Sequence, residues 1–140
     1  MLAARGQKAA FTITGTDNPT RDGTGLRDYI HVWDLARAHV RAIEEFDTVI
    51  AAADRPSVII NVGTGDGTTV RELVAAFERV FGQPVPIREA ESRPGDVPGA
   101  YANVDRSHEL LGWRAELTIE DAIASALAWG EKRQEILGYE

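Results

Sequence analysis

Apolar residues recur at spacings of three and four from residue 32 onward, which predicts an amphipathic helix. One face of this helix carries Val32, Leu35, Ala36, His39, Val40 and Ile43. Charged residues such as Arg37 and Arg41 fall on the opposite face. We therefore expect the apolar face to pack into the core, with His39 as a buried, hydrogen-bonded histidine.

A second amphipathic helix is predicted between Thr69 and Gly82. Its apolar stripe consists of Val70, Leu73, Val74, Phe77 and Phe81. Thr69 and Glu72 have the spacing of a capping box, although Thr68 is an equally suitable cap. Gly82 marks the expected end of the helix, because glycine readily adopts the left-handed conformation that follows a last turn.

Two further helices are predicted in the last third of the chain. The first covers residues 105–111 and ends at Gly112. Thr118 and Asp121 suggest a cap for the second. Its apolar positions are Ile119, Ala122, Ile123, Ala126, Leu127 and Trp129.

Three short segments have the composition of strands. Residues 11–14 form a β-prone run. Residues 57–62 (SVIINV) are almost continuously apolar, which is typical of a strand buried on both faces of a parallel sheet. Residues 85–88 predict a third strand, which Pro84 and Pro86 restrict to an edge or a surface. The combination of these strands with helices predicts an α/β fold.

Two irregular segments carry arginines suited to binding an anion. Residues 15–27 contain three glycines and almost no apolar side chain, and a loop of this length is usually functional or mobile. Arg27 closes this loop, while Arg93 lies in residues 92–99, three positions before Asp96. An arginine fork can approach a phosphate, and a nearby carboxylate can accept from ribose hydroxyls. A plain surface ion pair between Arg93 and Asp96 is an equally good interpretation.

Composition restricts the class of protein and of partner. The chain has 140 residues, of which 44% are hydrophobic and 26% charged, and this fits one globular domain. Its net charge of -7 argues against broad binding of nucleic acid or of an anionic membrane. The absence of cysteine excludes a disulfide scaffold, a thiol nucleophile and a thiolate zinc site. No stretch approaches the ~20 apolar residues that span a bilayer, and the first residues do not resemble a signal peptide, so we expect a cytoplasmic protein.

The residues alone predict no complete catalytic centre. Residues 63–67 (GTGDG) follow a predicted strand, but a dinucleotide fingerprint needs glycine at the position of Thr68. A tight turn between strand and helix explains these glycines better. The three histidines lack the spacing of metal ligands, and no G-x-S-x-G elbow is present. We therefore expect no metal site, and no cofactor-binding or catalytic residue, within this chain.

Several motifs in order along the chain resemble one enzyme family. Residues 22–36 (DGTGLRDYIHVWDLA), followed by Ala38-His39-Val40, resemble the signature of UDP-glucose 4-epimerases. The runs NVGTG, RPGD and LLGW, at residues 61–65, 93–96 and 110–113, resemble further elements of that family. The chain is thus similar to an extended short-chain dehydrogenase/reductase of the NAD-dependent epimerase/dehydratase type.

The resemblance implies a nucleotide-sugar site. Arg27 and Arg93 would contact the diphosphate of UDP, and Asp96 would contact the ribose. Ala100 matches a position whose size limits the C2 substituent of the sugar, so a small residue there suggests room for an N-acetyl group. The residues implied to bind the UDP-sugar are Thr12, Ile13, Thr14, Arg27, Tyr29, Asp66, Arg93, Asp96 and Ala100.

The base-binding side of this site departs once from the family pattern. Backbone groups of Thr12, Ile13 and Thr14 would meet the uracil edge, and Tyr29 and Asp66 would line the nucleotide pocket. The family commonly has an aromatic residue at the place of Thr14, so stacking on uracil is weakened or supplied by another group.

The resemblance covers less than half of such an enzyme. The family's chemistry requires an N-terminal GxxGxxG fold that binds NAD and a Tyr-x-x-x-Lys pair, but none of Tyr29, Tyr101 and Tyr139 has a lysine four residues later. Residues 1–140 would thus be a C-terminal UDP-sugar-binding segment whose NAD-binding Rossmann half is absent, with residues 57–62 joining the missing parallel sheet. We expect the chain alone to show no NAD-dependent turnover and to be marginally soluble, because that strand edge is exposed.

The implied activity is the interconversion of UDP-glucose and UDP-galactose through oxidation at C4 by bound NAD. Two alternatives stay open: a sister nucleotide-sugar epimerase or dehydratase, and a non-catalytic UDP-sugar-binding or interaction module. The expected partners are a UDP-sugar and either the N-terminal Rossmann half or a second copy in a homodimer. Nucleic acid and membranes are not expected partners.

Overall fold

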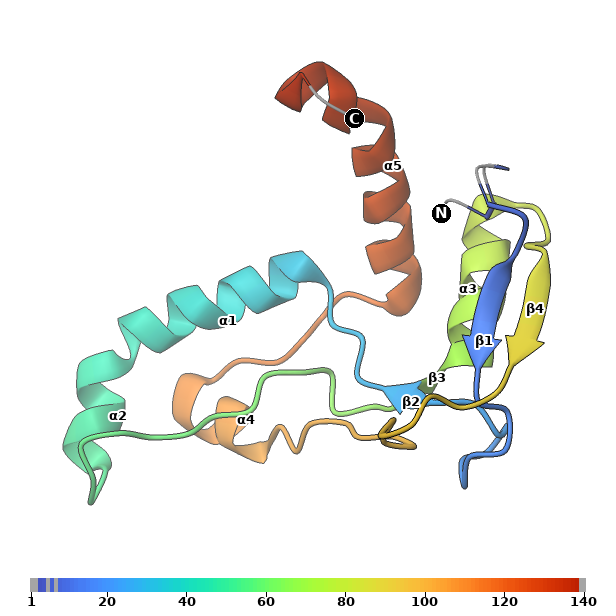
Figure 1. Ribbon diagram of the computed structural model, residues 1–140. Helices are drawn as coiled ribbons and strands as arrows, with labels where there is room; N and C mark the ends of the chain where they lie inside the picture. Colours follow the sequence, from blue (N-terminus) through green and yellow to red (C-terminus); the bar gives the residue numbers. More distant parts are fainter. Residues whose placement is uncertain (1–2, 5, 7, 139–140) are drawn as a thin grey trace.

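The computed structural model describes residues 3–4, 6 and 8–138 (Figure 1). This part of the chain has a mixed α/β structure, which confirms the predicted class. Its elements are β1 (Phe11–Thr14), β2 (Leu26–Arg27), α1 (Val32–Glu44), α2 (Phe46–Ala52), β3 (Thr68–Thr69), α3 (Val70–Phe81), β4 (Ile87–Ala90), α4 (Asp105–Leu111) and α5 (Ile119–Leu137).

The elements form two groups that meet at β2 and β3. In Figure 1, α1, α2 and α4 lie on one side of these strands, and α3, β1 and β4 lie on the other. Helix α5 contacts α3 and then extends beyond the rest of the chain. The pairing of β2 with β3, which we call the junction, therefore joins residues 26–27 to residues 68–69.

Helix α1 buries a different face from the predicted one. The Nδ1 atom of His31 accepts a hydrogen bond from the backbone N–H of Trp33 at 2.9 Å and so caps the helix. Asp34 and Ala38 are buried, whereas the side chains of Val32 and Ile43 are 73% and 77% exposed. The prediction that Val32, Leu35, Ala36, His39, Val40 and Ile43 pack into the core is wrong, since only Leu35 is half-buried.

The orientation of α1 follows from the carboxylate of Asp34. Its Oδ2 atom accepts hydrogen bonds from the backbone N–H groups of Glu116 at 3.0 Å and Leu117 at 2.8 Å. A buried carboxylate requires such partners, so this side of α1 faces the segment before α5. His39 is exposed as a result, and its Nδ1 lies 2.8 Å from the carbonyl oxygen of Leu35, so the prediction of a core histidine is wrong.

A hydrophobic core joins α1, α2, α4 and the residues around them. Its buried members are Ala38, Val49, Leu111 and Trp113. Partly buried residues packed against them are Ile30, Val58, Ile60, Val62, Leu110 and Ala115. The sequence pattern does not predict α2, although Val49 of this helix belongs to the core.

Residues 57–62 are not a strand buried on both faces. Val58, Ile60 and Val62 face the core, but Ile59 is 80% exposed, and no strand of the described residues pairs with this segment. A ladder needs a neighbouring backbone, and here the carbonyl oxygen of Ile59 accepts from Nη1 of Arg106 at 3.0 Å instead. The segment therefore buries one face only.

Helices α3, α4 and α5 begin or end at the predicted residues. Thr69, and not Thr68, caps α3 through a complete capping box with Glu72, and Gly82 ends it at φ 79°. Gly112 ends α4 at φ 58°. A reciprocal pair of hydrogen bonds joins Thr118 to Asp121 in the first turn of α5, which continues past Trp129 to Leu137.

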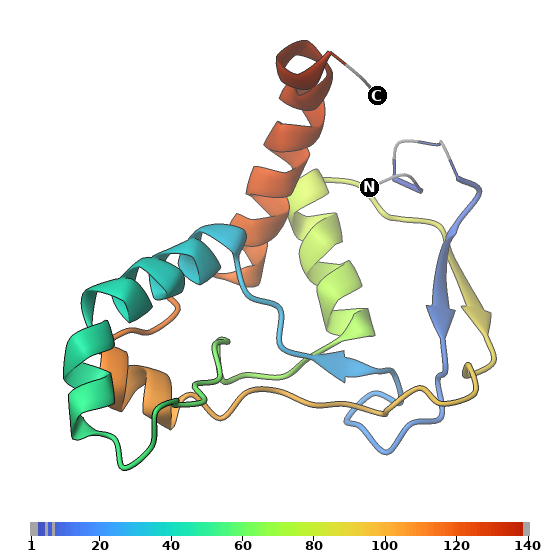
Figure 2. The same cartoon turned by 60° about the vertical axis from the view of Figure 1, so that its left-hand side comes forward.

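Strands β1 and β4 form a parallel two-stranded sheet, in which Phe11 is opposite Ile87 and Thr14 opposite Ala90. β1 matches the predicted segment, whereas β4 begins two residues later than predicted, after Pro86. Helix α3 lies beside this sheet in Figures 1 and 2. The prediction that the later strand lies at an edge is confirmed, because a sheet of two strands has only edges.

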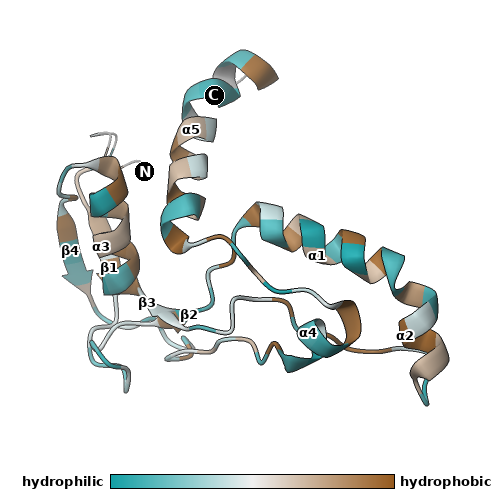
Figure 3. Cartoon of the chain, turned by 180° about the vertical axis from the view of Figure 1, so that it is seen from behind, coloured by the Kyte–Doolittle hydropathy of each residue, from teal (hydrophilic) through white to brown (hydrophobic). Residues whose placement is uncertain are grey.

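Apolar side chains remain at the surface of several helices. Figure 3 shows apolar positions along α1, α2 and α5 between polar ones. Exposed large apolar side chains on these helices are those of Val32, Trp33, Val40, Ile43, Phe46, Trp129, Ile136 and Leu137. Within the described residues, no helix has both the length and the apolar character needed to cross a membrane.

Candidate functional site

Strand β2 lies between two backbone segments and presents Arg27. Leu26 and Arg27 pair antiparallel with Thr69 and Thr68 of β3. On its other side Leu26 forms a parallel bridge to Gly99. This arrangement brings the end of the 15–27 loop next to the 92–99 segment, as the two predicted anion-binding segments require.

The Arg27 side chain connects β2 to the 92–99 segment. Its Nη1 donates to the carbonyl oxygen of Leu26 at 2.7 Å, and its Nη2 donates to the carbonyl oxygen of Val97 at 3.1 Å. A guanidinium carries five N–H donors, so these two bonds leave capacity for an anion. Arg27 is exposed, which makes it accessible to a ligand.

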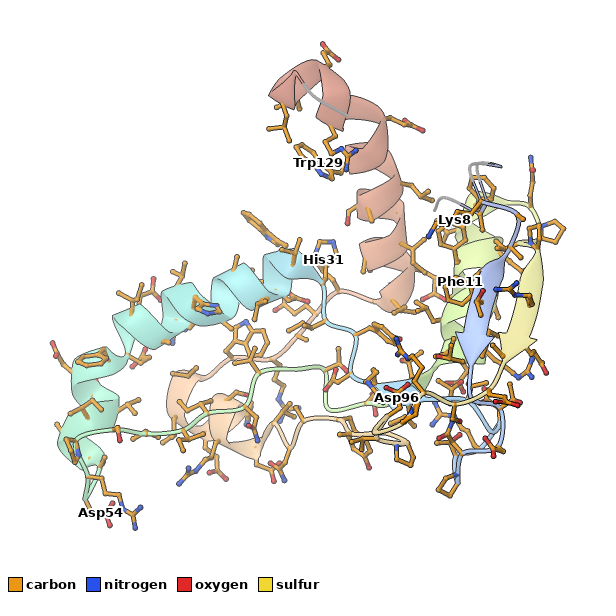
Figure 4. The ribbon with its side chains drawn as sticks, viewed as in Figure 1. Lys8, Phe11, His31, Asp54, Asp96 and Trp129 are labelled. Carbon is orange, nitrogen blue, oxygen red and sulfur yellow. The ribbon has the colours of Figure 1, made fainter. Side chains whose placement is uncertain are left out.

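Arg93 and Asp96 form an ion pair with each other. The Nε atom of Arg93 lies 3.0 Å from Oδ2 of Asp96, and the backbone N–H of Asp96 donates to the carbonyl oxygen of Arg93 at 3.1 Å. The Arg93 side chain is 71% exposed. The surface pair that the sequence left open is therefore present, and Figure 4 shows Asp96 beside β2.

The carboxylate of Asp28 holds three segments together at this junction. Its Oδ1 accepts from the backbone N–H of Thr64 at 2.9 Å and from the Thr64 hydroxyl at 2.6 Å. Its Oδ2 accepts from the backbone N–H groups of Gly65 and Ala102, both at 3.1 Å. Partial burial opposes ionisation of Asp28, but these hydrogen bonds outweigh it and hold the pKa of the carboxyl below its usual value.

Asp28 was not among the predicted site residues, although it stands between Arg27 and Tyr29. A Cβ atom at Gly63 would clash with Oδ2 of Asp28 and lie 2.8 Å from Cβ of Ala102. Glycine is thus required where this carboxylate approaches the backbone. The RDY motif could have indicated a structural carboxylate, because an acid next to glycine-rich segments often binds backbone N–H groups.

A second carboxylate fixes the 15–27 loop. Asp22 accepts from the backbone N–H of Thr24 at 2.9 Å, from its hydroxyl at 2.7 Å and from the Thr69 hydroxyl at 2.5 Å. Arg21 pairs with the Glu72 carboxylate and donates to the carbonyl oxygen of Gly67 at 2.6 Å. The loop is therefore tied to the start of α3.

The predicted uracil-binding strand borders a cavity. Ile13 of β1 is fully buried, Thr14 is half-buried, and Thr12 lines a cavity of about 720 Å³ together with Tyr29. Side chains from α3 and α5 form most of the remaining wall: Leu73, Val74, Phe77, Ile119, Ala122, Ile123 and Ala126. Burial raises the pKa of Tyr29, which the charge of Arg27 partly offsets.

The predicted residues are divided between two places. Arg27 contacts Val97 in the segment that carries the Arg93–Asp96 pair, and the N–H of the exposed Ala100 donates to the carbonyl oxygen of Leu26 at 3.3 Å. Thr12 and Tyr29 line the cavity, whereas Asp66 is exposed on the 63–67 turn and is not part of the cavity wall.

The glycines of the 63–67 turn lie against side chains of this chain. A Cβ at Gly63 would meet Asp28, one at Gly65 would lie 2.9 Å from Val104, and one at Gly67 would clash with Leu26. The glycines thus accommodate side chains of this chain, whereas a dinucleotide fingerprint uses glycine to admit a pyrophosphate. In the part of the chain that is described, no three His, Asp or Glu side chains gather as metal ligands.

Comparison with known proteins relates this chain to one group of enzymes. Residues 1–126 match the family described as GDP-mannose 4,6 dehydratase. UDP-glucose 4-epimerase 3 of Oryza sativa subsp. japonica is 44% identical over 129 residues, which are 92% of this chain and 34% of the rice protein. The chain therefore spans about a third of the length of this relative.

Solved structures of epimerases have the same fold over the matched part. The crystal structure of UDP-glucose 4-epimerase from Bifidobacterium longum in complex with NAD+ and UDP is 42% identical, with a TM-score of 0.81 over 93% of this chain and 37% of that one. The Stenotrophomonas maltophila UDP-glucose-4-epimerase structure, with bound NAD and formylated UDP-arabinopyranose, gives a TM-score of 0.85 at 36% identity, covering 96% of this chain and 39% of that one. The chain belongs to the GDP-mannose 4,6 dehydratase family of NAD-dependent epimerases and dehydratases, and it is homologous to part of the UDP-glucose 4-epimerases.

Proposed function

We propose that this chain is the C-terminal, UDP-sugar-binding segment of a UDP-glucose 4-epimerase-like enzyme. The observation that carries the proposal is the junction at β2, which brings Arg27 into contact with the segment that holds Arg93 and Asp96. Two arginines and a carboxylate at one exposed edge match the chemistry of a nucleoside diphosphate, whose phosphates accept and whose ribose hydroxyls donate.

The proposed roles follow the resemblance residue by residue. Arg27 and Arg93 bind the diphosphate, and Asp96 exchanges its pairing with Arg93 for the ribose when the ligand enters. The β1 residues Thr12, Ile13 and Thr14 present backbone groups to uracil. Tyr29 and Asp66 complete the nucleotide pocket; the part of Tyr29 is supported because it lines the same cavity as Thr12.

The sugar that the site accepts is proposed to include N-acetylated forms. Ala100 is exposed and carries only a methyl group, so it places little bulk next to the β2 junction. UDP-GlcNAc should therefore bind as well as UDP-glucose. No interaction with UDP-GlcNAc, alongside clear binding of UDP-glucose, would contradict this assignment.

NAD is proposed to bind to a separate part of the enzyme. Side chains of Asp28, Val104 and Leu26 occupy the space beside the glycines of the 63–67 turn. The sequence contains no Tyr-x-x-x-Lys pair. The NAD-binding half supplies hydride transfer at C4, and this chain supplies the diphosphate and base contacts that orient the sugar.

Exposed apolar surfaces of this chain support the proposal that it packs against an NAD-binding half. The exposed Val32, Val40 and Ile43 lie along α1, and the cavity between β1, α3 and α5 has mainly apolar walls. Exposed apolar area of this kind marks a surface for another protein segment. In this proposal, residues 57–62, with Ile59 outward, pair with the sheet of that half.

An activity assay tests the proposal directly. The chain alone should show no interconversion of UDP-glucose and UDP-galactose, and fusion to the NAD-binding part of a relative such as the Bifidobacterium longum enzyme should restore NAD-dependent turnover. Turnover by the chain alone would contradict the division of roles. A fusion that folds and binds NAD but does not bind UDP-sugar would contradict the proposed site.

A second candidate is a sister nucleotide-sugar epimerase or dehydratase, which the family match described as GDP-mannose 4,6 dehydratase favours. Turnover of a panel of nucleotide sugars by the same fusion separates this candidate from the first. Binding of UDP-sugars without turnover of any would indicate a non-catalytic binding module.

A further inference from the structure

We propose that Leu26 is a positioning residue that sets the separation between Arg27 and the 93–97 loop, and thereby the recognition of a diphosphate. The inference rests on the proposed function, because it assigns a role within the same UDP-sugar site. In the proposed function, Leu26 itself does not contact the ligand.

The backbone of Leu26 joins β2 to segments on both sides. It pairs with Thr69 of β3 on one side. On the other side its N–H donates to the carbonyl oxygen of Pro98 at 3.0 Å, and its carbonyl oxygen accepts from the N–H of Ala100 at 3.3 Å. The position of the segment 98–100 relative to β2 is therefore fixed at Leu26.

The same carbonyl oxygen also orients the Arg27 side chain. Nη1 of Arg27 donates to the oxygen of Leu26 at 2.7 Å, while Nη2 donates to the oxygen of Val97 at 3.1 Å. Arg27 and Ala100 thus share one acceptor. A shift of the 97–100 backbone away from β2 must break one of these bonds or move the guanidinium.

The Leu26 side chain lies between two glycines, and this restricts the junction from both sides. A Cβ at Gly99 would lie 2.7 Å from Cβ and 3.1 Å from the carbonyl oxygen of Leu26. A Cβ at Gly67 would instead meet the outer part of the side chain, 2.9 Å from Cγ, 3.0 Å from Cδ1 and closer to Cδ2. The first contact involves the Cβ and carbonyl oxygen of Leu26, whose positions the backbone fixes, whereas the second involves only outer side-chain atoms, which move when Leu26 rotates about χ1.

The two glycines therefore form a matched pair for an experiment. Gly99→Ala must widen the gap between β2 and the 98–100 segment, whereas Gly67→Ala need not. The affinity of a ligand falls with this widening only if the ligand contacts both Arg27 and the 93–97 loop. UDP has the diphosphate for both contacts, while uridine has the base and ribose alone.

The test is calorimetric titration of the 140-residue chain and its variants with UDP and with uridine. Gly99→Ala should weaken UDP binding by about tenfold or more and leave uridine binding within about threefold, because one charge-assisted contact is lost. Gly67→Ala, which displaces only the outer Leu26 side chain, should lower the ratio of UDP to uridine affinity less than Gly99→Ala does. Leu26→Ala, which removes the side chain from the junction, should also lower the ratio of UDP to uridine affinity.

Each outcome decides between a positioning role and a merely structural one. Equal losses for UDP and uridine in Gly99→Ala, or equal behaviour of Gly99→Ala and Gly67→Ala, overturn the proposal. If Gly99→Ala lacks a cooperative unfolding transition, the ratio in Leu26→Ala decides by the same criterion. Failure of the unaltered chain to bind UDP overturns the proposed function as well, whereas UDP binding with an unchanged ratio overturns the role of Leu26 alone.

Discussion

The Nη2 atom of Arg27 donates a hydrogen bond to the carbonyl oxygen of Val97, 3.1 Å away, across 70 positions of sequence. This bond joins a glycine-rich loop to a second irregular segment, each of which carries an arginine. Neither segment contains more than a few residues of regular structure. Their relative position therefore depends on particular contacts, and these contacts can be changed one at a time.

Replacement of Arg27 by lysine should lower UDP affinity about five- to tenfold, because an ammonium keeps the charge but lacks the planar fork. Arg27→Ala should lower it further. Calorimetry measures both. Arg55 provides the control, since it is exposed and stands next to Asp54, which Figure 4 places at the far end of the molecule from β2. An equal loss of affinity in Arg55→Ala would mean that Arg27 acts only through net charge.

Asp28→Asn should reduce the free energy of unfolding by about 1–3 kcal/mol, because an amide group replaces an oxygen that accepts from backbone N–H groups. The bonds at risk are those from Thr64, Gly65 and Ala102. Urea unfolding provides the measurement. Asp66→Asn should change stability by less than about 0.5 kcal/mol, because that side chain is exposed. Equal effects of the two substitutions would contradict the role assigned to Asp28.

Stability should fall as the pH is lowered from about 4.5 toward 2, partly through Glu72. The hydrogen bond from Arg21 and the backbone N–H of Thr69 lower the pKa of Glu72 from 4.5 to about 2 in the folded chain. A carboxyl with a lowered folded pKa stabilises the fold above its unfolded pKa, and this stabilisation is lost as the pH falls through the folded value. Because Arg21 and Glu72 are partly exposed, the effect is moderated by solvent.

The matched variant for this pH dependence is Glu72→Gln. Its melting temperature should fall less steeply with pH between about 4.5 and 2 than that of the unaltered chain. Part of the decrease in melting temperature with falling pH remains in this variant, because the pKa values of Asp22 and Asp28 are also lowered in the folded chain. Identical slopes for the variant and the unaltered chain would show that Glu72 does not contribute.

Ile43→Ser should leave the free energy of unfolding within about 0.5 kcal/mol and reduce self-association of the chain, because this side chain is exposed on α1. Sedimentation velocity measures the association, and urea unfolding measures the stability. Leu111→Ala, in the core, should instead lose about 2–5 kcal/mol. A large loss of stability in Ile43→Ser would support the core face that the sequence pattern predicts.

Local signals in the sequence predict the helix ends well. The capping box of Thr69 and Glu72 and the left-handed glycines at 82 and 112 are found at the predicted positions. These features depend on the hydrogen-bonding capacity of a few neighbouring residues. No distant segment needs to be known to identify them.

Packing faces could not be predicted in the same way. Helical periodicity indicates which residues of α1 share a side, but not which side meets the core. The carboxylate of Asp34 decides this, through backbone groups of Glu116 and Leu117 far along the chain. The prediction of a doubly buried strand at residues 57–62 is wrong for a similar reason. A strand needs a second backbone with which to form hydrogen bonds, and the described residues supply none for this segment.

The charged groups proposed for the candidate site come from the sequence, whereas the residues that support them come from the structure. Motif resemblance identified Arg27, Arg93 and Asp96, and the structure brings their segments together. It did not indicate Asp28 or Leu26, whose contacts are mainly with backbone atoms of other segments. Such roles become visible only when the segments are placed in space.

The most direct test of the account is calorimetric titration with UDP of the unaltered chain and of the double variant Arg27→Ala/Arg93→Ala. The account predicts saturable binding of UDP by the unaltered chain and at least about a tenfold loss of affinity in a double variant that melts at the same temperature. Absence of UDP binding by the folded, unaltered chain, or equal binding by the double variant, would contradict it.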